Sequence, residues 1–361
     1  MNIKQIKERI GFGSFKFWIN ILTLVALGLL MFFTKDQIID AFNTFGSLNF
    51  IWLLMVIPLQ LLNYFGVAKF YQSYLKTLGE KIKTRELYKV GLEMNFVNNV
   101  FPSGGVSGFG YLGVRLKKLG VRGSKSTLLQ TSRHFLTFLT FIVYLLLALL
   151  LLSIFGSASR LIILIASTLS SFIVFGSLIL IYIISDETRI KQFTGALPNL
   201  INSIFSFFHK DSKKPINVEK IEKLFGELNG DYKHVKKNWR DLRFPFMWSM
   251  LMNFTEIATI FVVYLSFSEI VNPGAIIISY AVANIAGLVS ILPGGVGIYE
   301  GLMTAVMASA GVNRALALSA TVVYRVFNMS IFLPIGYFFY QRALKEDGID
   351  PEKVPGLKDD D

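Results

Sequence analysis

The sequence predicts an all-α polytopic membrane protein, an inverted-topology repeat with six full spans and two re-entrant hairpins of broken helices. Three observations lead to this fold class. Of the 361 residues 53% are hydrophobic, and the mean hydropathy is +0.53, more apolar surface than a soluble domain carries. Apolar runs long enough to cross a hydrocarbon core of about 30 Å recur along the chain. Two glycine-rich segments interrupt shorter apolar regions.

The six spans are predicted to be helices, because a helix satisfies all its backbone polar groups within lipid. The first follows four basic residues, as a signal peptide does, but its apolar stretch is too long and no small-residue cleavage site follows. We therefore expect a retained helix. The predicted spans are Phe17–Phe33, Phe50–Ala68, Thr127–Leu152, Leu161–Ile184, Phe244–Phe267 and Ala315–Tyr340.

The distribution of basic residues predicts how these spans are oriented. Cytoplasmic loops hold an excess of Lys and Arg. Of the 36 basic residues, 31 lie in residues 1–16, 69–125, 185–243 and 341–361. Both termini are therefore expected in the cytoplasm, in a multi-pass protein of the cell membrane. The net charge of +12 reflects orientation first, and no nucleic acid is expected as a partner.

Two further apolar regions, residues 86–120 and 273–312, are too interrupted to be ordinary spans. Each has two short helical stretches around a centre rich in glycine, Pro102-Ser-Gly-Gly-Val-Ser-Gly and Pro293-Gly-Gly-Val-Gly. Proline and glycine break helices. Exposed backbone at membrane depth is tolerated only where protein or a water-filled cavity satisfies it. We therefore expect re-entrant hairpins whose tips line a cavity.

The two hairpins belong to a longer internal similarity with offsets of 190 to 192 residues. The matching residues are Asn63 and Asn253, Pro102 and Pro293, and Arg133 and Arg325. The two copies enter the membrane from opposite sides, an arrangement typical of transporters with a substrate site near the bilayer midplane. The predicted units are residues 1–152 for the first repeat, 153–345 for the second, and 346–361 for a cytoplasmic tail.

Residues 185–243 interrupt the second repeat with a polar, Lys-rich sequence. Ile221, Leu224, Phe225 and Leu228 recur within it at helical spacing. This pattern predicts a cytoplasmic elbow whose helix lies on anionic lipid heads. A solvated linker is the alternative.

Four ionisable residues are predicted at membrane depth, where such residues usually face a cavity, a partner or a substrate path. Arg133 could reach the interface along its helix, and Arg325 lies deeper; each could bind a phosphate or pair with a carboxylate. Glu300 starts a half-helix, where it could cap free N–H groups, pair with an arginine, exchange a proton or contact a cationic headgroup. Glu256 is a second candidate proton site.

Polar residues around the helix breaks complete the predicted substrate site. Amides can satisfy broken backbone or bind headgroup oxygens, and free N–H groups at the start of a half-helix form an anion site. The residues concerned are Asn63, Asn98, Asn99, Ser103, Gly104, Gly105, Asn253, Gly294, Gly295 and Tyr299.

Several kinds of chemistry are not expected. The sequence has no cysteine and three histidines, so it offers no thiolate site, no His-rich metal cluster and no cofactor site. The segment Gly108-Phe-Gly-Tyr-Leu-Gly113 fits a dinucleotide fingerprint, but no strand precedes it. No GxxxxGK[ST] motif for ATP is present. We expect a protein that is not an enzyme.

The two glycine-rich segments also carry a family resemblance. Phe101-Pro-Ser-Gly-Gly-Val-Ser-Gly-Phe-Gly, Pro293-Gly-Gly-Val-Gly-Ile-Tyr-Glu-Gly and the Lys-rich loop resemble the membrane domain of the lysylphosphatidylglycerol synthase/flippase family, which includes the multiple peptide resistance factor. The resemblance covers about residues 10–345. It implies translocation of an aminoacylated phospholipid between leaflets. The family's separate soluble domain, which transfers the amino acid, has no counterpart here, so lysyl transfer is not expected.

The sequence therefore predicts a lipid flippase for a phospholipid or lipid-linked polar headgroup, of aminoacyl-phospholipid or glycolipid type. Its expected partners are membrane lipids with an anionic or phosphate-bearing headgroup. One alternative is a secondary transporter or channel for a small anion. Another is a membrane scaffold for a lipid-modifying enzyme, which would then be a partner. The lipid, the energy source and homo-oligomer formation stay open.

Overall fold

The computed structural model describes residues 48–101, 106–154, 185–196, 239–289 and 295–346, with a few positions between 164 and 233. These residues form helices joined by short connections, with no strand among them, so the all-α prediction is confirmed for this part of the chain. Outside the described residues lie the predicted span Phe17–Phe33, most of the span Leu161–Ile184, most of the elbow 185–243, residues 347–361 of the tail, and the tip residues Ser103, Gly104, Gly105 and Gly294.

Four helical segments are long and apolar enough to cross a membrane, and they coincide with four of the six predicted spans. The first segment is α3 (Phe50–Leu54) followed by α4 (Val56–Thr77), and the second is α7 (Gly123–Ile154). The third is the short helix η1 (Trp239–Leu242) followed by α11 (Arg243–Ser266), and the fourth is α14 (Arg314–Glu346). The first extends nine residues beyond the predicted Ala68. It continues because Phe70, Tyr71 and Tyr74 bury their rings in the core.

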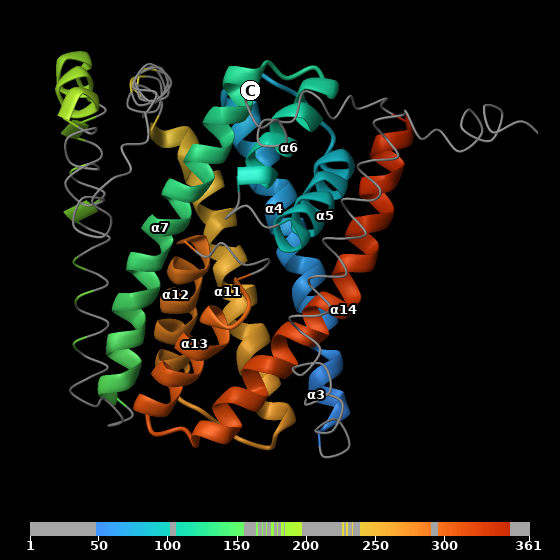
Figure 1. Cartoon of the computed structure of the whole chain (residues 1–361), viewed down its shortest axis with the longest axis vertical. Coiled ribbons are helices and arrows are strands. Elements are labelled where there is room, and N and C mark those ends of the chain that lie inside the picture. The colour runs from blue at the N-terminus through green and yellow to red at the C-terminus, as the bar shows by residue number, and fades with distance from the viewer. Residues whose placement is uncertain are drawn as a thin grey trace, which may run out of the picture.

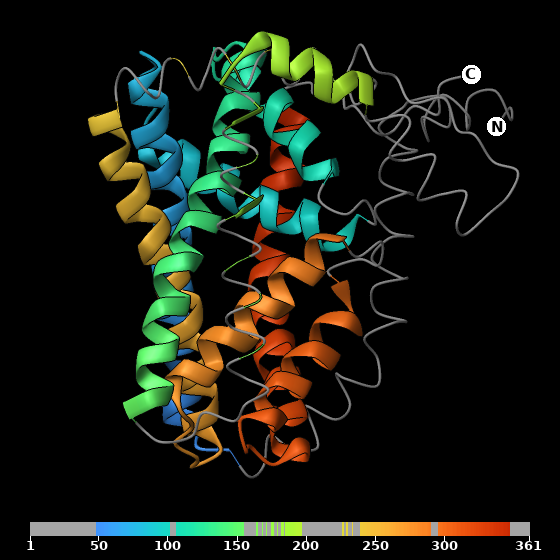
Figure 2. The ribbon, with the colours of Figure 1, turned by 90° about the vertical axis from the view of Figure 1, so that its left-hand side faces the viewer.

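Two pairs of shorter helices correspond to the interrupted regions. The pairs are α5 (Thr84–Val100) with α6 (Val106–Lys118), and α12 (Pro273–Val289) with α13 (Ile298–Ser309). Phe101 is extended, as expected for the residue before a proline, and this ends α5. Each helix has 12 to 17 residues and reaches about 18–26 Å at 1.5 Å per residue. The two pairs occupy opposite halves of the molecule (Figures 1 and 2).

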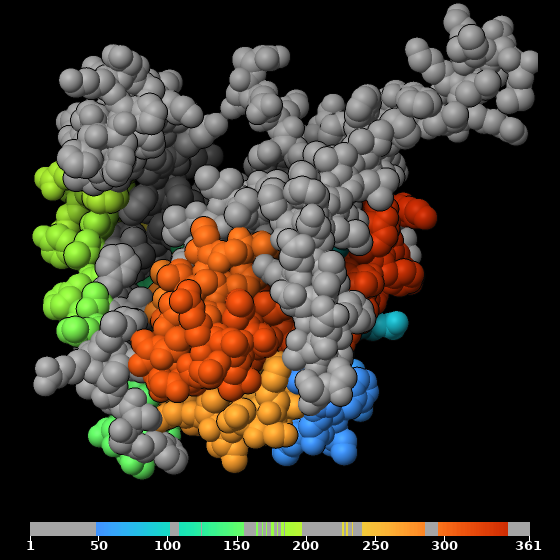
Figure 3. All heavy atoms as spheres, turned by 60° about the horizontal axis from the view of Figure 1, so that its bottom comes forward, coloured from blue at the N-terminus to red at the C-terminus, as the bar shows by residue number. Residues whose placement is uncertain are grey.

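The packing joins the two halves of the chain. α4 packs along α11 at the centre, α14 packs on α5, and α7 packs on α12 (Figure 1). At the central crossing, Gly66 of α4 faces Met252 of α11. The end of the molecule seen in Figure 3 is formed largely by the second half of the chain, whose orange surface lies between the green end of α7 and the blue α3.

Beyond the long helices, residues 187–196 form a helix at the start of the predicted elbow. Asp186 begins it, since the backbone N–H groups of Arg189 and Thr188 donate to Asp186 Oδ1 over 3.3 Å and 2.8 Å. These two hydrogen bonds favour the carboxylate and lower the pKa of Asp186 below its ordinary value. The arrangement is a helix N-cap.

The crossing of α14 over α5 depends on a glycine. A Cβ atom on Gly336 would lie 2.5 Å from the carbonyl oxygen of Leu92 and 2.9 Å from Cβ of Phe96. Backbone cannot move aside as a flexible side chain does. The two helices can therefore approach this closely only without a side chain at residue 336.

We expect Gly336→Ala to destabilise the fold by roughly 1–3 kcal/mol, as overpacking does, and to lower the thermal unfolding midpoint in detergent. The control is Gly113→Ala in α6, because a Cβ at Gly113 meets nothing within 4 Å. Alanine is the better helix former, so the control should unfold at the same or a higher temperature. If Gly336→Ala unfolds at the same temperature as Gly113→Ala, the added methyl group at the crossing has no specific cost and the crossing tolerates a side chain.

Candidate functional site

Arg325 of α14 and Glu300 of α13 form a buried ion pair. Arg325 Nη1 donates to Glu300 Oε1, and both side chains are buried. The other carboxylate oxygen, Oε2, accepts a hydrogen bond from the backbone N–H of Gly297 at 2.6 Å. Gly297 has a φ of +86°, a conformation that favours glycine. Glu300 therefore both caps α13 and pairs with Arg325, two of the roles proposed for it from the sequence.

Tyr299 holds the same guanidinium from another side. The guanidinium carbon of Arg325 lies 5.0 Å from the centre of the Tyr299 ring, a cation–π distance. The ring and the carboxylate come from adjacent residues of α13. Their spacing fixes the arginine head beside the break that precedes this helix.

Glu256 of α11 has neutral partners, one of which, Tyr324, precedes Arg325 in α14. Its Oε2 accepts hydrogen bonds from Tyr324 at 2.7 Å and from Gln60 at 3.2 Å. Gln60 also donates to Thr259 at 3.2 Å. The side chain is half-buried, and no ion pair to Glu256 is found among the described residues. A carboxyl group held by neutral donors can take up or release a proton without breaking an ion pair.

The charge of Glu256 influences tyrosines of four helices, and of these Tyr324 donates a hydrogen bond to it. Its carboxylate acts electrostatically on the hydroxyl groups of Tyr64 in α4, Tyr280 in α12, Tyr299 in α13 and Tyr324 in α14. We call these four residues the tyrosine cluster. Sequence reasoning identified Tyr299 but missed the other three. They lie far apart in the sequence on different helices, so no local pattern relates them. The one available signal is that Tyr324 directly precedes Arg325.

Arg133 of α7 is held by Tyr71 of α4. Its guanidinium donates to the hydroxyl of the buried Tyr71 and lies 5.4 Å from the centre of that ring. Its charge also acts on Tyr64 and Tyr280. No carboxylate pairs with Arg133 within the part of the chain that the structure describes. Arg325 and Glu300 thus contact each other, whereas Arg133 contacts Tyr71 and Glu256 contacts Tyr324 and Gln60.

The predicted asparagines mostly link helices. Asn63 donates to the carbonyl of Met252 and to Thr255, both at 2.9 Å, and so ties α4 to α11. Asn253 donates to Thr140 of α7 at 2.6 Å. Both side chains are buried, so hydrogen bonding between helices is the role that the geometry gives them.

The amides near the helix breaks lie differently. Asn99 donates to the backbone and side-chain oxygens of Asn95, both at 2.9 Å, within α5. Asn98 is exposed and its side chain lies where a Cβ of Gly108 would be, so α5 and α6 meet closely. Gly295 is buried with a φ of +68°. The backbone donors of the other tip residues lie outside the described residues.

Comparison with protein families matches residues 18–336 to the lysylphosphatidylglycerol synthase TM region. The chain belongs to this family. A relative from Methanothermobacter thermautotrophicus, described as a UPF0104 membrane protein, is 28% identical over 131 residues. That match spans 35% of this chain and 39% of the relative. With four apolar helices of spanning length, the chain is a membrane protein.

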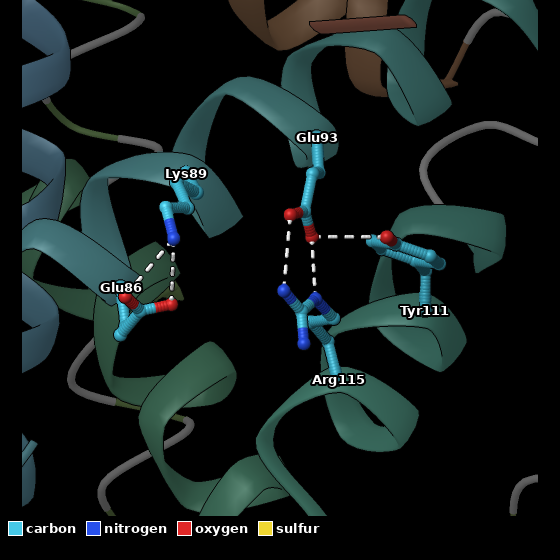
Figure 4. A network of polar contacts seen from close by, with 5 residues as sticks. All are labelled: Glu86, Lys89, Glu93, Tyr111 and Arg115. Atoms are coloured by element: carbon cyan, nitrogen blue, oxygen red, sulfur yellow. Dashed lines mark hydrogen bonds and ion pairs between the residues drawn. The ribbon is translucent and has the colours of Figure 1, made fainter. Parts of the chain in front are cut away.

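In this lysylphosphatidylglycerol synthase-type chain, a second buried ion pair joins α5 to α6. Arg115 donates from Nε to Glu93 Oε2 at 2.8 Å and from Nη2 to Oε1 at 3.3 Å, and Tyr111 donates to Oε2 at 2.9 Å (Figure 4). Glu93 is 1% exposed and Arg115 is 7% exposed. Sequence reasoning did not single out this pair: Arg115 was counted as one of the basic residues of the predicted cytoplasmic segment 69–125, and neither residue was a site candidate.

A signal for this pair exists in the sequence. Glu93 falls in the helical stripe of Val90, Val97 and Val100, so its face of α5 is otherwise apolar and buried. A charge within an apolar stripe needs a partner, because burying it alone is costly. Each broken helix pair thus contributes a glutamate to a buried ion pair. Glu93 of α5 pairs with Arg115 of α6, and Glu300 of α13 pairs with Arg325 of α14.

Proposed function

We propose that this protein is a lipid flippase of the cell membrane, which moves a phospholipid or lipid-linked polar headgroup between leaflets without catalysing a chemical reaction or using a cofactor. One observation carries the proposal. Inside a bundle whose helices are apolar outside, Arg325 pairs with Glu300, Glu256 accepts hydrogen bonds from the neutral Tyr324 and Gln60, and the half-buried Arg133 donates to the buried Tyr71. Membership of the lysylphosphatidylglycerol synthase TM-region family supports it.

The packing supports an inverted repeat of residues 1–152 and 153–345. The last span of each unit packs on the first half-helix of the other unit's broken pair: α7 on α12, and α14 on α5. The helices that carry Asn63 and Asn253 pack against each other at the centre. A pseudo-two-fold axis between α4 and α11 would produce this reciprocal packing of the two units. Alternating access would then rock the two units about this axis.

The position of the broken pairs in opposite halves supports re-entrant hairpins that enter from the two membrane faces. Each pair is too short to form two spans of a core of about 30 Å. The tips would meet near the bilayer midplane, where the first N–H groups of α6 and α13 could face a phosphate. Both termini and the elbow would lie in the cytoplasm, where the basic residues are concentrated.

The two arginines would have different tasks in binding a headgroup phosphate. Arg133 is held by a neutral phenol, so it can bind an anion without displacing a carboxylate. Arg325 must exchange Glu300 for the phosphate. A substrate that reaches Arg325 would therefore weaken the link between α13 and α14. This exchange offers a physical reason for substrate binding to change the arrangement of the helices.

Glu256 is the candidate site for coupling to a proton gradient. Its partners Tyr324 and Gln60 are neutral, so no ion pair among the described residues would be broken by protonation. Tyr324 is adjacent to Arg325 in α14, so a change of charge at Glu256 acts directly beside the phosphate site. The alternative is that lipid moves down its own concentration gradient without coupling to protons, and the experiment with a proton gradient distinguishes the two.

The test is leaflet exchange in liposomes that contain the purified full chain and fluorescent lipids with phosphatidylglycerol, aminoacyl-phosphatidylglycerol, glycolipid or phosphatidylcholine headgroups. We expect faster exchange of at least one phosphate-bearing lipid than in protein-free liposomes. With an imposed proton gradient, the rate should change in the wild type and in Glu269→Gln, which alters an exposed carboxyl group near the end of α11. It should not change in Glu256→Gln.

Failure of the chain to move any of these lipids would overturn the flippase proposal. Passage of chloride or inorganic phosphate in the same liposomes would then favour the small-anion transporter. If the exchange rate of Glu256→Gln still responds to the proton gradient, the flippase proposal stands but Glu256 is not the coupling site.

A further inference from the structure

A second candidate site lies away from the tyrosine cluster, between α4, α5 and α14. A cavity of about 470 Å³ opens there, within the range of about 300–1,000 Å³ typical of small-molecule sites. Phe65 of α4, Tyr88 of α5 and Phe339 of α14 form its aromatic wall. The Tyr88 hydroxyl donates to the carbonyl of Leu61 at 3.4 Å, which positions this ring against α4.

The cavity is lined by three cationic side chains. Arg85 and Lys89 come from the first turns of α5, and Arg342 comes from the last turns of α14. Lys89 also pairs with Glu86 at 3.0 Å, as Figure 4 shows. The exposed Arg85 and Arg342 belong to different helices that converge on the same cavity. Among the described residues that line the cavity there are three cationic side chains and no acidic one.

The start of α5 adds to this electrostatic preference. Thr84, which also lines the cavity, is the first residue of this 17-residue helix, and its hydroxyl donates to Gln72 of α4 at 2.8 Å. The free N–H groups and the positive dipole end of a helix favour an anion. Side-chain cations and helix dipole thus act in the same direction on a group placed in the cavity.

The surroundings of the cavity are apolar on the two long helices. Leu61 and Leu62 of α4 are 45% and 40% exposed, and Ile335 and Phe338 of α14 are 38% and 59% exposed. In a membrane protein such surfaces face acyl chains. A ligand of this cavity therefore meets cations and a helix start at one end and a lipid-facing apolar surface beside it.

We propose that this cavity binds an anionic phospholipid, with the phosphate between Arg85 and Arg342 and the acyl chains along α4 and α14. Guanidinium groups suit phosphate because they donate two hydrogen bonds in a planar fork. The site is separate from Arg133 and Arg325, so lipid held here is bound to the outside of the bundle and is not the translocated molecule. It would stabilise the crossing of α14 over α5.

The experiment titrates the detergent-purified full chain with dioleoylphosphatidylglycerol or dioleoylphosphatidylcholine and counts bound lipids by native mass spectrometry. The test variant is Arg85→Gln/Arg342→Gln. The matched control is Lys81→Gln/Lys345→Gln, which removes one exposed cation three residues before α5 and one in the last turn of α14, neither of which lines the cavity. We expect the test variant to need at least ten times more phosphatidylglycerol for half-saturation of one site, and the control less than twice as much.

The single variants Arg85→Gln and Arg342→Gln provide a second measurement, and each should weaken phosphatidylglycerol binding by a smaller factor. Equal binding by wild type and test variant would overturn the proposal. So would equal weakening in the control, which would indicate general surface charge. Tight phosphatidylcholine binding, or displacement of the lipid by millimolar inorganic phosphate, would overturn the assignment to an anionic phospholipid. Because binding is measured, the result does not depend on leaflet exchange.

Discussion

Arg325→Met is expected to abolish leaflet exchange and to destabilise the protein by about 3–5 kcal/mol, the range for removing one partner of a buried ion pair. The loss arises because the buried carboxylate of Glu300 would lose its cationic partner and retain, among the described residues, the backbone N–H of Gly297 as a donor. Thermal unfolding and leaflet exchange, measured on the same preparation, report the two effects.

The double variant Glu300→Gln/Arg325→Met separates the two roles of this arginine. Removing both charges should recover most of the lost stability, since a buried pair replaced as a whole is often close to neutral. Exchange should remain absent, because the phosphate would still lack Arg325. Arg314→Met removes an exposed cation from the first residue of the same helix and should change neither property. Recovery of exchange in the double variant would show that Arg325 is structural.

Glu93→Ala is expected to have the second largest effect, a destabilisation of about 3–5 kcal/mol at the junction of α5 and α6. The substitution removes the carboxylate that accepts two hydrogen bonds from Arg115 and one from Tyr111 (Figure 4). Glu93→Gln keeps an acceptor and should cost less. Thermal unfolding followed by tryptophan fluorescence measures both variants.

Glu86→Ala is a matched control for this prediction in the same helix. Glu86 pairs with Lys89 in a partly exposed i,i+3 pair, whose side chains are 33% and 24% exposed. Such surface pairs contribute roughly 0–1 kcal/mol. If Glu93→Ala is no more destabilising than Glu86→Ala, the buried pair does not hold α5 to α6.

The elements that sequence reasoning predicts well are those with a local cause. Four predicted spans match helices, because about 20 apolar residues suffice to specify a spanning helix whatever its neighbours. The break after Val100 follows from Pro102, which disfavours helical geometry at Phe101. The cap at Glu300 likewise follows from its place three residues into a half-helix.

The composition of the candidate site was only partly predictable. Arg133, Arg325, Glu256 and Glu300 stood out because charges within apolar runs are rare. Glu93 did not, since α5 also carries Arg85, Glu86 and Lys89 and is not a continuous apolar run. The partners of Glu256, Gln60 and Tyr324, lie 196 and 68 residues away in the chain. No local pattern links residues at such separations.

The sequence by itself therefore determined that this chain crosses a membrane as helices, where its helices break, and which charged residues enter apolar runs. These properties depend on the free energy of transferring each segment into lipid and on backbone geometry at proline and glycine. Only the tertiary structure decided which charges meet. The choice of Glu300 for Arg325, of Arg115 for Glu93 and of neutral donors for Glu256 depends on how helices cross, and crossings depend on close contacts such as Gly336 against Leu92.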